Sequence, residues 1–175
     1  MIWESYHWKE PLLQSASWLR RVRLGPGTRE STLVRIEKEL FIGFYTIRKL
    51  LDTLKVSDST KGQSYNLEFS PNRKRVDYLN WHHVDECYDL ETRRSETRNL
   101  RFLCNLFIHS FVFVVCGEGP LEGFFVASDK MMNQKVYYVS IDQVIHAFRL
   151  VGRDYPDEVH LLRDPKTGEF RGRVT

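Results

Sequence analysis

Cysteine is scarce in this chain, and long apolar runs are missing from it. The three cysteines, Cys87, Cys104 and Cys116, form no CxxC pair and cannot all pair with one another. An odd and sparse set of cysteines is typical of free thiols in a reducing compartment, so we expect a cytoplasmic protein. The longest apolar run, residues 111–116, has six residues, whereas a membrane-spanning helix needs roughly 20. We therefore expect no contact with a membrane.

Several signatures of enzymes and of targeting segments are missing as well. The glycines at 117 and 119 are followed by Pro120 rather than by a helix that starts with Lys and Ser or Thr, so no phosphate-binding loop is present. No GxSxG nucleophile elbow occurs. The first ten residues carry charges and no apolar segment, which argues against a secretion signal. We expect no cofactor.

The overall composition is that of an ordinary globular protein. Apolar residues make up 42% and charged residues 28% of 175 positions, which excludes a disordered chain. The length fits one domain, and we expect it over residues 1–154, with a C-terminal tail or hairpin over residues 155–175. The net charge of +3 permits a nucleic-acid partner without demanding one.

Apolar residues at helical spacing predict two long helices and a shorter one before them. The strongest signal, over residues 28–55, comes from Leu33, Ile36, Leu40, Phe44, Ile47, Leu51 and Leu54. Phe41 and Tyr45 broaden this apolar face, so the helix can pack on two sides, against a protein partner or against a second copy in a homodimer. We expect the other long helix over residues 90–110 and the short one over residues 8–24, where Leu-Gly-Pro-Gly ends it.

The remaining patterns favour short strands and one closing helix. Strands are expected at 65–69 and 76–79, separated by a Ser-Pro-Asn turn at 70–72. Runs at 111–116, 121–127 and 135–139 predict a three-stranded antiparallel meander. Ser140 is a candidate N-cap for a helix to about residue 150, and Asp-Pro-Lys-Thr-Gly at 164–168 is a turn signal. The predicted fold class is α+β.

Residues 101–110 carry polar side chains at helical spacing within an apolar stretch. They read Arg-Phe-Leu-Cys-Asn-Leu-Phe-Ile-His-Ser, so Arg101, Asn105 and His109 recur every four residues. Residues four apart lie about 6 Å from each other along one face of a helix. An imidazole oriented by an amide can take the proton of a 2′-hydroxyl while a guanidinium contacts the phosphate, and this chemistry needs no metal. The alternative is that His109 only satisfies buried backbone groups where the helix meets a strand.

Residues 104–109 read Cys-Asn-Leu-Phe-Ile-His and follow a long helix that contains Ile-Arg-Lys-Leu-Leu at 47–51. In this combination the chain resembles the HEPN family of small helical RNases. The signature of that family is an Arg separated from a His by four to six residues, commonly with Asn directly after the Arg. Asn105 and His109 match the Asn and the His. The window for the Arg, residues 102–104, holds Phe, Leu and Cys, and Arg101 lies one residue before it.

The resemblance implies an RNA-directed homodimer with a composite cleft, of the kind found in toxin–antitoxin and antiviral defence systems. It implies metal-independent endoribonuclease activity or, since the motif Arg is missing, RNA binding at a degenerate active site. His109 would be the general base, Asn105 would orient it, and Arg101 would be a displaced phosphate contact. The candidate RNA-binding residues are the basic clusters Arg73, Lys74 and Arg75, and Arg93, Arg94 and Arg98.

Two other interpretations of the sequence need to be weighed. Residues 82–87 contain His82, His83, Asp85, Glu86 and Cys87, all potential metal ligands, but their spacing matches no zinc pattern. We therefore assign no metal site. The competing function is a non-enzymatic interaction module, accessory or antitoxin-like, that binds a protein partner through the helix at 28–55. The two functions differ at His109, which lies open in a basic cleft in the first and is packed in the second.

Overall fold

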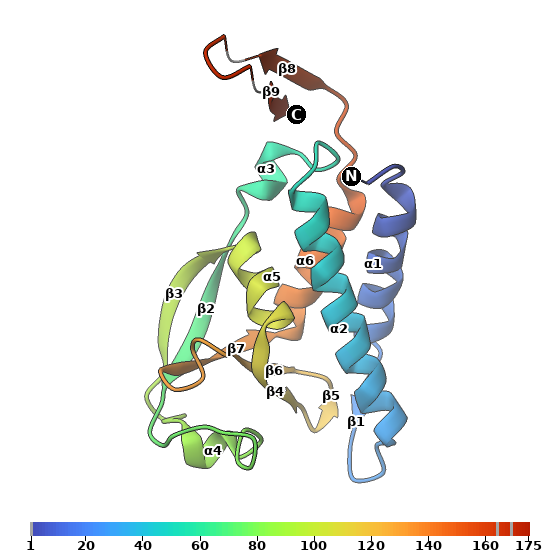
Figure 1. Cartoon of the computed structure of the whole chain (residues 1–175). Coiled ribbons are helices and arrows are strands. Elements are labelled where there is room, and N and C mark those ends of the chain that lie inside the picture. The colour runs from blue at the N-terminus through green and yellow to red at the C-terminus, as the bar shows by residue number, and fades with distance from the viewer. Residues whose placement is uncertain (1, 164, 169) are drawn as a thin grey trace.

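The computed structural model describes residues 2–163, 165–168 and 170–175, and it shows long helices packed on one side of a twisted antiparallel sheet (Figure 1). The predicted α+β class is confirmed. The helices are α1 (Tyr6–Leu19), α2 (Glu30–Leu51), α3 (Asp58–Lys61), α4 (Val84–Cys87), α5 (Leu100–Ile108) and α6 (Ile141–Arg153). The strands are β1 (Arg23–Leu24), β2 (Ser64–Pro71), β3 (Arg94–Asn99), β4 (Ser110–Cys116), β5 (Gly119–Pro120), β6 (Gly123–Ser128), β7 (Lys135–Ser140), β8 (Val159–Arg163) and β9 (Phe170–Val174).

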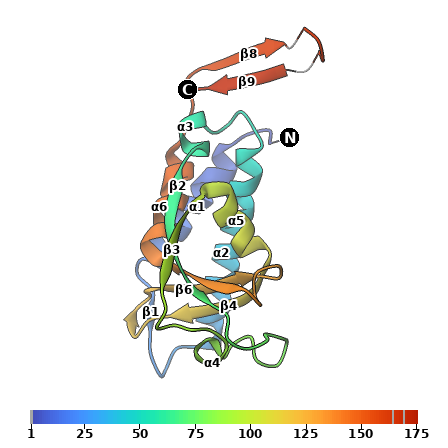
Figure 2. The same ribbon diagram turned by 90° about the vertical axis from the view of Figure 1, so that its left-hand side faces the viewer.

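The main sheet has five strands in the order β3-β2-β7-β6-β4, and every neighbouring pair is antiparallel. Strands β4, β6 and β7 are the predicted meander. The predicted sheet had two strands too few, because β2 pairs with β7 and β3 pairs with β2. The views in Figures 1 and 2 show β2 and β3 rising beside the helices, while β4, β6 and β7 lie beneath them.

The predicted helix at 90–110 was wrong in its first half. Residues 94–99 form strand β3, and only Leu100–Ile108 are helical. Strand β3 pairs with β2 from Arg94↔Phe69 to Asn99↔Ser64, and this long-range pairing makes residues 94–99 extended, so the helix is confined to the apolar stretch that follows. Asn99 then starts α5, since its side-chain oxygen accepts a hydrogen bond from the backbone N–H of Phe102 at 2.8 Å.

The expected strand at 76–79 and turn at 70–72 were also wrong. Strand β2 continues through Pro71, and residues 76–79 form an irregular segment that leads into a turn. The side chain of Asn80 holds this turn, accepting from the N–H of Asp77 at 2.8 Å and donating to the carbonyl of Arg75 at 2.9 Å. Local Asx bonds of this kind compete with strand formation.

The other helix predictions hold with shifted ends. The first helix ends at Leu19 rather than at 24, and the long amphipathic helix covers Glu30–Leu51 within the predicted 28–55. Helix α6 begins after Ser140, as predicted, with a full capping box between Ser140 and Gln143. No helix in the described part of the chain is long and apolar enough to span a membrane.

Aromatic rings join the helices to the sheet. Phe44 of α2 stacks on Phe107 of α5 with 4.2 Å between ring centroids, and it meets Phe148 of α6 edge-on at 5.2 Å. Phe107 in turn contacts Phe124 of β6 at 6.1 Å. All four side chains are fully buried, so each contributes both hydrophobic burial and specific ring geometry to the core.

A separate hairpin, β8–β9, follows α6 and projects from the top of the molecule (Figure 2). It covers part of the region predicted as tail or hairpin. The backbone N–H of Val174 donates to Asp58 at 3.1 Å, which ties the last strand to α3.

Gly43 allows α2 and α6 to approach each other closely, and this contact is open to test. A Cβ atom at position 43 would lie 2.2 Å from Cζ of Phe148, so we expect Gly43→Ala to lower the free energy of unfolding by about 1–3 kcal/mol. Urea denaturation monitored by circular dichroism measures the change. Gly27→Ala is the control, because nothing lies within 4 Å of its Cβ position; equal stability of the two variants would contradict this account.

Candidate nucleic-acid interface

The polar line predicted from the sequence lies on one helix and reaches the surface. Arg101 and Asn105 project from α5, and His109 is the C-cap residue that follows it. Asn105 and His109 are exposed and Arg101 is half-buried. The backbone N–H of His109 donates to the carbonyl of Asn105 at 3.1 Å, and the carbonyl of His109 accepts from the N–H of Asp129, also at 3.1 Å. The backbone of His109 is therefore fixed, while its ring has no hydrogen bond within the described part of the chain.

Arg48 of α2 and Asp52, the C-cap residue of that helix, complete the cluster around this line. Arg48 donates to the side-chain oxygen of Asn105 at 3.3 Å and forms an ion pair with Asp52. Arg101 donates to the other oxygen of Asp52 at 2.9 Å. Partial burial acts to raise the pKa of Asp52, but the hydrogen bonds from Arg101 and Arg48 outweigh it and hold the pKa below its ordinary value. With two guanidinium groups around one carboxylate, the cluster keeps a net positive charge.

A groove runs alongside α5 and brings Arg101, Asn105 and His109 together with the turn between β6 and β7. Its deeper part has a volume of about 500 Å³ and is lined by Phe102, Asn105, Leu106, His109, Ser128, Asp129, Lys130 and Met131. A shallower part is lined by Thr97, Arg98, Asn99, Arg101, Phe102 and Asn105. The two parts share Phe102 and Asn105, and we call them together the α5 groove.

A partly buried ionic network lies beside the α5 groove and fixes its wall. Glu96 of β3 accepts hydrogen bonds from Lys135 at 2.8 Å, from Arg98 at 3.0 Å and from the hydroxyl of Tyr137. The guanidinium of Arg98 also lies 4.8 Å from the ring centre of Phe102. Because the network bonds Arg98 to Glu96 and stacks it on Phe102, it holds a cation and an aromatic ring together at the groove.

The structure divides the predicted RNA-binding arginines and lysines between two places. Arg98 lines the α5 groove. Arg94 lies on the same face of β3, because Arg94, Glu96 and Arg98 follow one another at intervals of two residues. Three others are paired elsewhere: Arg93 with Glu68 at 3.5 Å, Arg73 with Asp89 at 2.6 Å and Lys74 with Glu86 at 3.4 Å. Arg75 is exposed, and its backbone carbonyl accepts from Asn80. Residues 73–75 belong to the loop that packs on the outer face of the sheet, so they do not line the groove.

Neither the histidine-rich loop at 82–87 nor Cys104 lines the groove that contains His109. The rings of His82 and His83 lie 4.0 Å apart on the loop that precedes α4, and neither lines the α5 groove. Within the residues that the structure describes, no three His, Cys, Asp or Glu side chains converge on a possible metal position. Burial raises the pKa of the Cys104 thiol to about 12, which keeps it protonated and unreactive.

Sequence reasoning missed Arg48, Asp52, Phe102, Lys130 and Met131. Arg48 and Asp52 form an i,i+4 pair that reads as the solvated side of α2, and nothing in the local pattern shows that α5 packs beside them. Lys130 and Met131 lie in a turn far along the chain. Only the pairing of β4 with β6 and of β6 with β7 brings that turn to the end of α5.

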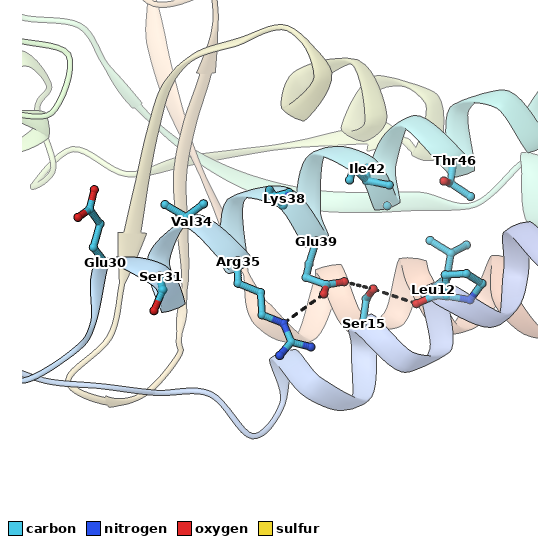
Figure 3. A pocket seen from close by; sticks show the side chains of 12 residues that line it. Leu12, Ser15, Glu30, Ser31, Val34, Arg35, Lys38, Glu39, Ile42 and Thr46 are labelled. Carbon is cyan, nitrogen blue, oxygen red and sulfur yellow. Dashed lines mark hydrogen bonds and ion pairs between the residues drawn. The ribbon is translucent and has the colours of Figure 1, made fainter.

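A second groove lies between α1 and α2 (Figure 3). We call it the α1–α2 groove; its volume is about 600 Å³. Val34, Lys38, Ile42 and Thr46 line it along α2, with Leu12 and Ser15 across from them on α1. Glu39 accepts from Arg35 at 3.3 Å and from the hydroxyl of Ser15, which links the two helices. Val34 and Ile42 are 45% and 61% exposed, so the apolar wall of this groove faces solvent.

Comparison with known proteins found no matching family model, no similar curated protein and no similar solved structure. The interpretation of the grooves therefore depends on their chemistry.

The Glu96 network makes a specific contribution to stability at acidic pH. Burial acts to raise the pKa of Glu96, but the hydrogen bonds from Lys135, Tyr137 and Arg98 outweigh it and lower the pKa from 4.5 to about 2. A carboxyl group whose pKa is lower in the folded state stabilises the fold above its unfolded pKa, and this stabilisation is lost as the pH falls toward 2. We expect the wild type to lose about 2 kcal/mol more than Glu96→Gln between pH of about 5 and about 2.

Urea denaturation at a series of pH values tests this expectation. Glu37→Gln is the control, since Glu37 is exposed on α2 and has no ion pair in the described part of the chain. If Glu96→Gln and Glu37→Gln lose stability in parallel with the wild type over this pH range, Glu96 does not carry the effect.

Proposed function

We propose that this protein binds single-stranded RNA in the α5 groove. The observation that carries the proposal is the open position of His109, whose ring faces a groove that also presents Asn105, Phe102 and several cationic side chains. A histidine with a purely structural role at the end of α5 would be packed or hydrogen-bonded, and the ring of His109 is exposed and has no hydrogen-bond partner within the described residues. The proposal rests on this groove, and the HEPN resemblance of residues 104–109 adds to it.

The lining of the α5 groove suits both parts of a nucleotide. Phe102 is half-buried, with one side against Tyr137 at a centroid distance of 5.5 Å and with Arg98 near its ring. Aromatic rings and arginine planes are the usual platforms for unstacked bases. Lys130 is exposed at one end of the groove, and Arg101 lies toward the other. Cations at both ends of an aromatic platform can contact successive phosphates of an RNA strand.

Cleavage at this site would depend on His109. A nitrogen of the imidazole would take the proton of a 2′-hydroxyl, the oxygen would attack the adjacent phosphorus, and the bond from phosphorus to the 5′-oxygen would break, with water protonating the leaving oxygen. Arg101, held by Asp52, is the one guanidinium that α5 carries, and it would contact a phosphate about two helical turns from His109. Asn105 is held by Arg48 and lies one turn of helix before His109.

Reversing the charge of Lys130 tests the binding proposal. We expect Lys130→Glu to weaken binding of a fluorescein-labelled single-stranded RNA by about tenfold at low salt, because a phosphate contact becomes a repulsion. Fluorescence anisotropy measures the affinity. The control is Arg29→Glu, the same reversal at an exposed arginine outside the groove. Absence of RNA binding by the wild type, or equal weakening by both variants, would refute the proposal.

The same preparations decide whether His109 performs chemistry. A mixed RNA pool is incubated in EDTA with the wild type, with His109→Ala and with His7→Ala, a control at another exposed histidine. Cleavage by the wild type and by His7→Ala, with loss in His109→Ala, would assign His109 as the general base. Binding without cleavage in all three proteins would leave an RNA-binding protein in which His109 contacts the ligand only.

A second candidate function, self-association, is favoured by the α1–α2 groove. Val34 lies in the second turn of α2 and is 45% exposed, with Glu30 four residues before it and Lys38 four residues after it, and all three line this groove. Neither Glu30 nor Lys38 has an ion-pair partner in the described part of the chain. If two copies of α2 cross antiparallel at Val34, each Glu30 meets the partner's Lys38 while Val34 is buried at the two-fold axis. This arrangement is self-complementary, as a two-fold dimer requires.

A charge swap tests this homodimer. We expect the wild type to sediment as a dimer and Lys38→Glu to shift it toward monomer, because the carboxylate introduced at position 38 would then face the partner's Glu30. The double variant Glu30→Lys/Lys38→Glu restores the pairing with the signs exchanged, and we expect it to recover the dimer. Sedimentation velocity gives the oligomeric state. A monomeric wild type, or a double variant as dissociated as the single one, would exclude this interface.

A further inference from the structure

A third groove, distinct from the first two, lies between α6 and the segment that contains α3. It has a volume of about 700 Å³ and we call it the α6 groove. Its lining residues are Arg20, Ser57, Ser59, Thr60, Asp142, Ile145, His146, Arg149, Leu150, Arg153 and Asp154. Figure 2 shows α3 close to the upper end of α6. None of these residues lines the α5 groove or the α1–α2 groove.

One face of α6 supplies the basic side of this groove. His146, Arg149 and Arg153 follow one another at intervals of three and four residues, so they share a helix face. The opposite face of α6 is buried in the core and carries Val144, Phe148 and Val151. The packing of that apolar face therefore fixes the direction in which the basic side chains point.

Each carboxylate in the groove has a partner other than Arg149 and Arg153. Asp142 forms an ion pair with Arg20 at 3.3 Å. The carboxylate of Asp154 accepts two hydrogen bonds from Ser57, from its N–H and from its hydroxyl, each at 2.9 Å. Its charge also attracts the buried Lys9. Arg149 and Arg153 have no ion-pair or hydrogen-bond partner within the described residues, so two positive charges in the groove are uncompensated.

Hydrogen-bond donors lie beside these arginines. The hydroxyl of Tyr65 is buried and lies 3.1 Å from Nδ1 of His146. The hydroxyl of Tyr65 can donate to Nδ1 of His146, and in that tautomer Nε2 carries the proton. His146 is exposed, and its Nε2–H is then available to the groove. Ser59 and Thr60 also line the groove, and the hydroxyl of Ser59 lies 2.9 Å from that of Ser57.

We propose that the α6 groove binds the phosphate monoester group of a small organic molecule. Arg149 and Arg153 would contact the phosphate oxygens through guanidinium groups, whose geometry matches phosphate, and His146 would donate from Nε2. Two features favour a monoester over the backbone of a nucleic acid. The two uncompensated charges match the charge of about −1.5 to −2 on a monoester at neutral pH, whereas a backbone phosphate carries one negative charge. The volume also falls within the range of small-molecule sites.

Thermal unfolding in the presence of phenyl phosphate tests this proposal. We expect the ligand to raise Tm of the wild type, and we expect the double variant Arg149→Gln/Arg153→Gln to lose at least about tenfold in affinity by calorimetric titration. The control is Arg21→Gln/Arg29→Gln, which removes the same charge from exposed positions outside the groove. Circular dichroism of each variant shows that it folds.

The outcomes separate this site from the α5 groove. A response of the wild type and of the control variant, lost in Arg149→Gln/Arg153→Gln, with unchanged RNA affinity in all three, supports a small-molecule phosphate site. No response of the wild type to phenyl phosphate, or an equal response in both double variants, overturns the proposal. Loss of RNA affinity in Arg149→Gln/Arg153→Gln without any phosphate response also overturns it and assigns the arginines to an RNA surface. Failure of the wild type to bind RNA leaves the phosphate result unaffected.

Discussion

The contact of Phe44 with Phe107 and Phe148 is the interaction on which the rest of the structure depends. These three rings belong to α2, α5 and α6, and Phe107 continues the contact to Phe124 in the sheet. Because all of them are fully buried, the three helices cannot shift independently. Close packing transmits this constraint to the surface, where each helix forms one wall of a groove.

The α5 groove and the α6 groove differ in how their charges are balanced. Around α5, Asp52 and Glu96 are each surrounded by more cations than they neutralise, and the arginines are held in fixed positions by those carboxylates. Around α6, the carboxylates bond to Arg20 and Ser57, and Arg149 and Arg153 remain unpaired within the described residues. Cations held in place suit an extended ligand with spaced charges, whereas unpaired neighbouring arginines suit one compact anion.

The departure from an all-helical arrangement bears on the HEPN resemblance. In the structure α5 is a helix of nine residues that directly follows strand β3, and the sheet beneath it supplies the turn with Lys130 and Met131. The groove at His109 is thus formed by one chain, from a helix and a β-turn. RNA binding at this position needs no composite cleft between two copies, so the RNA-binding and self-association proposals stand independently of each other.

Local pattern accounts for much of the fold. The apolar period of α2, the cap at Ser140 and the three-strand meander all follow from side chains that are near one another in the sequence. Strand β3 could not be predicted in this way, because Arg-Ser-Glu-Thr-Arg-Asn is extended only through its pairing with β2. The irregular segment at 76–79 was missed for a similar reason, since the bonds of Asn80 hold it in a turn.

By itself, the sequence determined that Arg101, Asn105 and His109 share the line of one helix and that α2 has a broad apolar face, because helical periodicity is a local property. The tertiary structure alone decided that Arg48 and Asp52 join that line, that Arg73 and Lys74 are paired on the far side of the sheet and that Arg149 and Arg153 stay unpaired among the described residues. Charge neutralisation depends on distances of a few ångströms between segments that are remote in the chain. Those distances are set by packing and strand register, which no local pattern contains.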